Sequence, residues 1–87
     1  MYELVLKILD TSRDKDVDVL VAYDMVANEI GYTDELKNAR NFIKKYYYTI
    51  TKCRRAKDNE SIKTLCDLVA EGNIEKIRDF EDEIENR

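Results

Sequence analysis

The chain contains no proline, no histidine and no tryptophan, and it has only two glycines and two cysteines. Without proline, and with glycine only at Gly31 and Gly72, nothing breaks a helix internally and little is available for β-hairpin turns. These absences favour an all-α fold. At 87 residues, the chain is expected to form one domain, residues 1–87, with a single modest core.

The lack of histidine removes the commonest general base and metal ligand. Ser12 and Ser61 lie in polar stretches with no base to activate them, and two isolated glycines cannot form a phosphate-binding loop. We therefore expect no catalytic residue, no metal site and no cofactor, and a protein that is not an enzyme. Cys53 and Cys66 occupy apolar positions of predicted helices, which favours buried reduced thiols over a disulfide.

Long hydrophobic runs are also missing. No apolar stretch approaches the roughly 20 residues that cross a bilayer, and no basic start precedes an apolar core. The sequence predicts a cytoplasmic protein without a membrane partner.

The hydrophobic periodicity predicts four to five helices packed as a compact bundle around one long central helix. The expected helices cover residues 2–10, 17–30, about 34–57 and about 60–71, and a last one starts after Asn73. Asp16, Thr33 and Asn73 are expected to cap helix starts, and the two glycines to end helices. The polar stretch 11–16 is expected to be a loop.

The predicted central helix carries a basic stripe. Residues 37–57 contain eight Lys or Arg and no acid, in a chain whose formal net charge is -4. On a helical wheel Tyr46 and Tyr47 face the core, and Tyr48 lies among the cations. This stripe is the candidate nucleic-acid surface, because cations neutralise phosphates and a tyrosine stacks on a base. Its residues are Lys37, Arg40, Asn41, Lys44, Lys45, Tyr48, Lys52 and Arg55.

Two other surfaces are candidates for binding a protein. An apolar ridge at Val17, Val21 and Met25, spaced four residues apart, lies away from the main apolar face of its helix. It is either covered by a neighbouring helix or free to bind a partner. The last helix carries acids that either form a plain solvated face or mimic phosphates at a partner's basic groove. These are Glu75, Asp79, Glu81, Asp82 and Glu83, followed by Glu85.

Two short segments resemble known motifs. Residues 65–80 are similar to the helix, turn and helix of an ankyrin repeat, through Ala70, Gly72, Asn73 and Glu75, although the Thr-Pro-Leu-His opening is missing. That resemblance implies a tight antiparallel helical hairpin. Residues 26–43 resemble a helix-turn-helix, with Ala27 and Gly31 four residues apart. The position where that motif has an apolar residue is Lys37.

The function expected from these features is a protein-interaction module that acts as a stoichiometric regulator or inhibitor. Small acidic helical proteins with segregated charge, such as phage or viral inhibitors and toxin immunity proteins, suit this task by fold-level analogy. The alternative is a DNA- or RNA-binding protein that uses the basic stripe, against the long-range repulsion of an acidic chain. The apolar stripe of the last helix also leaves a homo-oligomer open.

Overall fold

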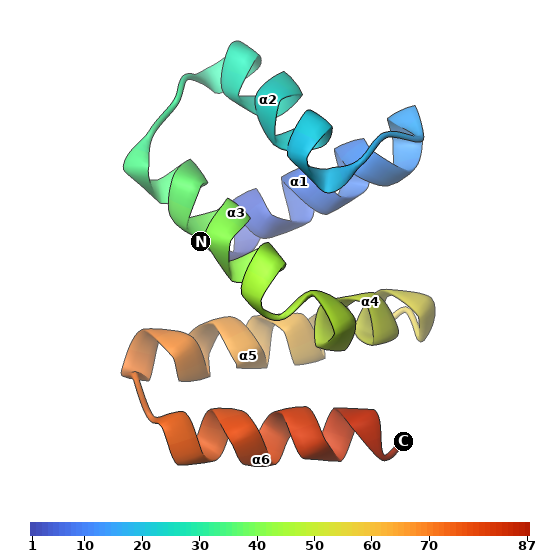
Figure 1. Cartoon of the computed structure of the whole chain (residues 1–87), viewed down its shortest axis with the longest axis vertical. Helices are drawn as coiled ribbons and strands as arrows, with labels where there is room; N and C mark the ends of the chain where they lie inside the picture. Colours follow the sequence, from blue (N-terminus) through green and yellow to red (C-terminus); the bar gives the residue numbers. More distant parts are fainter. The chain divides into compact units, whose positions relative to one another are not determined.

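The computed structural model describes all 87 residues and contains six helices and no strand, which confirms the all-α prediction. The helices are α1 (Tyr2–Lys15), α2 (Val19–Ile30), α3 (Asp34–Lys45), α4 (Tyr47–Arg55), α5 (Asn59–Glu71) and α6 (Ile74–Glu85) (Figure 1). The chain divides into two compact units, Met1–Lys45 and Tyr46–Arg87. That residues 1–87 fold as one domain stays a prediction. None of the six helices combines the length and the apolarity that a membrane span requires.

In the first unit, α1 lies against both α2 and α3, and α2 also contacts α3 (Figure 1). Burial of the apolar faces of three short helices is the main source of stability for such a unit, because none of them is long enough to be stable alone. Its core is made of Val5, Ile8, Ala22, Tyr23, Val26, Ala27, Leu36, Ala39, Phe42 and Ile43.

The end of α1 differs from the prediction. The polar stretch 11–16 is not a loop, since the helix continues to Lys15. Arg13 and Lys15 are good helix formers, and Arg13 pairs with Asp10 one turn earlier at 3.5 Å. Asp16 does not cap α2 but closes α1 in the left-handed conformation, with φ at 53°. The cap of α2 is Asp18, whose side chain accepts a hydrogen bond from the Leu20 amide at 3.0 Å.

The start of α3 agrees with the prediction. The hydroxyl of Thr33 accepts a hydrogen bond from the Leu36 amide at 3.1 Å. Asp34 and Glu35 follow in the first turn, where negative charge is favoured by the helix dipole. The local chemistry of residues 33–36 is therefore sufficient to set this helix start.

The long central helix is not formed, so that prediction is wrong. α3 ends at Lys45, and Tyr46 has φ at -112° and ψ at 30°, outside the helical region. Three successive tyrosines followed by β-branched residues have low helix propensity, which weakens the chain at this point. Tyr46 is buried as predicted. Tyr47, predicted to face the core, has 48% of its surface exposed.

In the second unit, each of α4, α5 and α6 contacts the other two. α5 and α6 lie side by side as a hairpin, which agrees with the expectation from the ankyrin-like segment (Figure 1). Gly72 ends α5 with φ at 75°, and the Asn73 side chain accepts a hydrogen bond from the Lys76 amide at 3.1 Å. The prediction for this turn is confirmed because glycine and asparagine carry its geometry locally.

Both cysteines are free and buried, as expected. Burial raises the pKa of the Cys66 thiol to about 11, and it also raises the pKa of the Cys53 thiol. The thiol form is therefore favoured at neutral pH, and these side chains pack as small hydrophobic groups.

Candidate partner-binding faces

The outward side of α2 is apolar and uncovered by the helices of its unit. Val21 and Met25 are 47% and 38% exposed, and Leu20 beside them is 45% exposed. At about 100° per residue, Val21 lies about 140° and Met25 about 100° from the buried Val26, so both lie outside the buried side of the helix. We call Leu20, Val21 and Met25 the α2 apolar face.

The predicted ridge is thus present in part. Val17 precedes the helix and is only partly exposed, and its carbonyl accepts a hydrogen bond from the Ser12 hydroxyl at 2.6 Å. It belongs to the turn between α1 and α2, so the four-residue helical spacing applies only to Val21 and Met25. The sequence left open whether a neighbouring helix covers the ridge or a partner binds it. Coverage by a neighbouring helix does not apply to Val21 and Met25, which are exposed.

Leu20 has the helical spacing of the buried side of α2, since the buried Tyr23 and Ala27 follow it by three and seven residues, but its side chain is exposed at the edge of the α2 apolar face. The buried positions of α2 are Ala22, Tyr23, Val26 and Ala27. Leu20 and Ile30 have the spacing of these positions but remain exposed. The only sequence signal for the exposure of Leu20 is its position near the start of the helix.

Asp24 lies within the α2 apolar face, and a hydrogen bond holds its side chain in place. Asp24 is one turn after Leu20, and its Oδ1 accepts a hydrogen bond from the Tyr32 hydroxyl at 3.3 Å. The Tyr32 ring packs edge-on against Tyr23, with ring centroids 5.9 Å apart. Removal from water, followed by the charge of Asp24, raises the pKa of Tyr32. The phenol therefore keeps its proton at neutral pH and donates it to the carboxylate.

The α6 acidic face is the second candidate surface. Glu75, Asp79, Asp82 and Glu83 recur at one-turn and two-turn intervals and are all exposed, on the side opposite the buried Ile84. None of these four carboxylates takes part in an ion pair. Glu81, which was grouped with them from sequence, is only partly exposed and lies at a different angle around the helix.

The apolar stripe of α6 is largely occupied. Ile77 and Ile84 are buried, and α6 contacts α4 and α5. Ile74 is left 70% exposed. Little of this stripe remains for a dimer seam, and a homo-oligomer stays a prediction.

The predicted basic stripe is divided by the break at Tyr46. A wheel that assumes one straight helix does not apply across a break, so the stripe becomes two shorter sets. Lys37, Arg40, Asn41, Lys44 and Lys45 belong to α3, whereas Tyr48, Lys52 and Arg55 belong to α4. The prediction that all eight residues share one helical face is wrong.

On α3, one of the predicted contact residues supports the fold instead. The Arg40 guanidinium carbon lies 5.0 Å from the centre of the Tyr23 ring, within the range of a cation–π interaction. Its Nη2 donates to the Asn41 side-chain oxygen at 3.2 Å. Arg40 therefore links α3 to α2, while Lys37 and Lys44 are exposed and make no ion pair.

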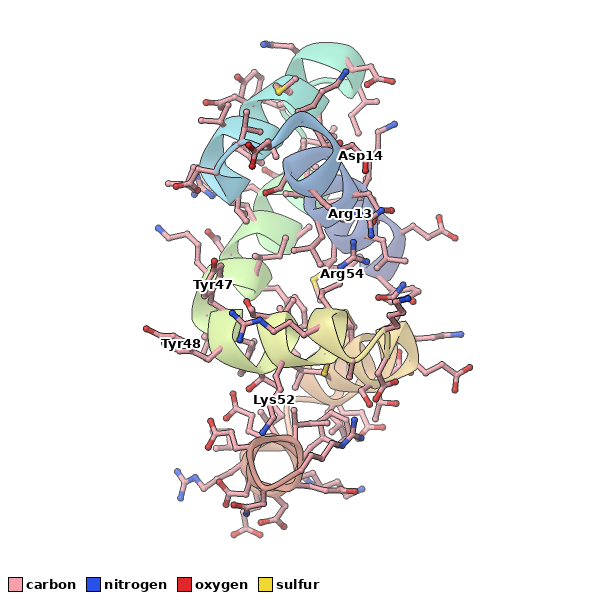
Figure 2. All side chains as sticks on the ribbon, turned by 90° about the vertical axis from the view of Figure 1, so that its right-hand side faces the viewer. Arg13, Asp14, Tyr47, Tyr48, Lys52 and Arg54 are labelled. Atoms are coloured by element: carbon pink, nitrogen blue, oxygen red, sulfur yellow. The ribbon has the colours of Figure 1, made fainter.

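On α4, the predicted residues have different roles. Lys52 extends towards α6 (Figure 2), where its Nζ donates to the main-chain carbonyl of Glu85 at 2.7 Å. A cation at the end of a helix is favoured by the helix dipole, so Lys52 stabilises the second unit. Tyr48 points outward with 85% of its surface exposed and packs edge-on against Tyr47, with ring centroids 5.9 Å apart (Figure 2).

In the structure, the segment that resembles a helix-turn-helix departs from that motif at Lys37, as it does in the sequence. α2 and α3 are joined by residues 31–33, and Ala27 is buried as the motif expects. Lys37 is exposed, and Leu36 is the buried residue instead.

Comparisons with protein-family models, with curated proteins and with solved structures found no match to this chain.

Proposed function

We propose that this chain is a non-enzymatic interaction module that binds another protein stoichiometrically and regulates or inhibits it. The observation that carries the proposal is the α2 apolar face. Leu20, Val21 and Met25 remain exposed there, although other side chains of α2 are buried in the core of its unit. Exposed apolar side chains grouped on an outward helix face are typical of protein-binding surfaces, because their removal from water supplies affinity.

The α6 acidic face supports the same proposal in a different way. Four unpaired carboxylates on one side of a helix attract a basic partner over a distance and increase the rate of encounter. Inhibitors that present such faces to basic grooves include phage and viral proteins, by analogy of size and charge alone. In this proposal, the α2 apolar face supplies affinity and the charges supply steering.

The test is affinity capture from the source cell at physiological salt with two matched variants. Val21→Asp places a charge in the α2 apolar face, and Ile74→Asp makes a similar change at an exposed apolar residue of α6. We expect a protein that is captured by the native chain and by Ile74→Asp, and lost with Val21→Asp. Recovery of nucleic acid without any protein partner contradicts the proposal.

Nucleic-acid binding is the second candidate, and the exposure of Lys37, Asn41 and Lys44 along α3 favours it. Binding to DNA or RNA through phosphates would weaken steeply as salt is raised. Replacing both Lys37 and Lys44 by Glu tests this without disturbing Arg40 or Lys52, which hold the fold.

If the chain binds nucleic acid through α3, the variant with both Lys37→Glu and Lys44→Glu should lose this binding and the dependence of binding on salt. A control with the same sign of charge change is Lys63→Glu, since Lys63 is an exposed residue of α5. Equal affinity of the double variant and the native chain eliminates this candidate.

A further inference from the structure

The chain segment that contains the α2 apolar face carries charge of one sign. Residues 16–36 contain six acids and no Lys or Arg, and the nearest bases along the chain are Lys15 and Lys37. Within α2 itself the only charged residues are Asp24 and Glu29. The exposed large apolar side chains are concentrated in the same stretch: Leu20, Val21, Met25, Ile30 and Tyr32.

Neighbouring elements neutralise only part of this charge. Lys7 of α1 reaches Glu29 at 3.5 Å, near the end of α2, and the Arg40 guanidinium of α3 lies over the Tyr23 ring. Asp24 has no cation partner, and it accepts a hydrogen bond from Tyr32 on one carboxylate oxygen. A carboxylate has about four acceptor sites, so most of the capacity of Asp24 remains available to a donor from a partner.

Asp24 is also well placed among the apolar side chains. At about 100° per residue, it lies between Leu20 and Val21 around the helix. A partner that covers both Leu20 and Val21 therefore removes Asp24 from water as well. Leaving that carboxylate unpaired would be costly, so the partner must supply a hydrogen-bond donor at this point, and a cation makes the strongest such pair.

We infer that the α2 apolar face binds a basic amphipathic helix of another protein. Its apolar side chains, spaced about one turn apart, would cover Val21 and Met25, and a Lys or Arg at the margin would pair with Asp24. This inference rests on the proposed function and adds the chemistry of the partner.

A second copy of the chain fits this surface less well. An isologous contact uses the same patch on both subunits, so it would bring the two acidic surroundings together and place the two Asp24 side chains near one another. Like charges that face each other in an interface cost several kcal/mol. This cost corresponds to a loss of affinity of about a hundredfold or more.

The experiment is selection from a displayed library of 18-residue amphipathic helices against the full chain. Leucines on one face are fixed, and the flanking positions are drawn equally from Lys, Glu, Ser and Gln. We expect Lys to be enriched in the flanks of peptides whose binding is lost with Val21→Ser. The Asp24→Lys variant should bind those peptides about tenfold more weakly or worse, and should itself select Glu at one flanking position.

The matched control is Glu75→Lys, which makes the same charge change on the α6 acidic face and should leave the selected flanks unchanged. Peptides that require Val21 but carry neutral or acidic flanks overturn this inference and leave the proposed function standing. Selection of no peptide that depends on Val21 overturns both. A dimer that sedimentation shows to depend on Val21 also overturns the inference, since the occupant would then be a second copy.

Discussion

Arg87, the last residue of the chain, donates from Nη1 to Oδ2 of Asp58 at 2.6 Å, and its Nη2 lies 3.3 Å from the Ser61 hydroxyl oxygen. Asp58 is also the cap of α5, because its Oδ1 accepts a hydrogen bond from the Ser61 amide at 3.1 Å. One carboxylate thus joins Arg87, just beyond the C-cap of α6, to the start of α5. The stability of the second unit should depend on the ionisation of this group.

The first prediction concerns pH. Hydrogen bonding to Arg87, and then to Ser61, lowers the pKa of Asp58 from 3.8 to about 2. Because the unfolded chain binds the proton more readily, the free energy of unfolding falls as pH decreases through the range from about 4 to about 2. Titration of the Asp58 carboxyl by NMR should give a pKa near the lower value. In Arg87→Gln, the pKa should move back towards 3.8, and an unchanged value contradicts the assigned cause.

The second prediction compares two isoleucines of α6. Ile84 is fully buried, whereas Ile74 is 70% exposed. Ile84→Ala removes buried methyl groups and leaves a cavity, so it should reduce the free energy of unfolding by about 2–5 kcal/mol. Ile74→Ala should change it by less than about 0.5 kcal/mol. Urea denaturation followed by circular dichroism measures both, and similar losses in the two variants would contradict the packing of α6.

The third prediction tests whether residues 1–87 form one domain. If both units unfold together, Ile84→Ala should accelerate hydrogen exchange of the most protected amides of Met1–Lys45 as much as those of Tyr46–Arg87. The reciprocal variant, Ile8→Ala in the buried part of α1, should act equally on both. Exchange that changes only in the mutated unit would mean that the two units fold independently.

The fourth prediction concerns the turn between α4 and α5. Lys57 has φ at 57°, a left-handed conformation in which a side chain is disfavoured and glycine is not. Lys57→Gly should therefore raise the free energy of unfolding by up to about 1 kcal/mol. The control is Ala56→Gly, since Ala56 has φ at -83° and should lose about 0.5–1 kcal/mol. Destabilisation by both changes would refute the assigned backbone conformation.

The parts of the fold that were predictable from sequence are those fixed by local chemistry. The cap at Thr33, the left-handed Gly72 and the cap at Asn73 each depend on one side chain and the next few amides. The break at Tyr46 is of a different kind. Low helix propensity there is visible in the sequence, but the burial of Tyr46 and the exposure of Tyr47 depend on which side chains pack in the second unit.

The candidate site was predictable only in part for the same reason. Val21 and Met25 were identified because their spacing separates them from the main apolar face. Leu20 was not identified, because its helical spacing groups it with the buried residues of α2, and its exposure depends on how α1 and α3 pack against that helix. Arg40 and Lys52 were assigned to a binding surface by charge, although contacts with Tyr23 and with the Glu85 carbonyl use them within the fold. Such contacts between helices leave no signal in a single sequence.

Binding of a protein by the α2 apolar face, as we propose, can be tested by site-specific photo-crosslinking in the source cell. A benzophenone amino acid is placed at Val21 in one sample and at Ile74, another exposed apolar position, in a second. We expect the benzophenone at position 21 to form one discrete protein adduct that the benzophenone at position 74 does not form. No adduct from position 21, the same adducts from both positions, or an adduct with nucleic acid alone would contradict it.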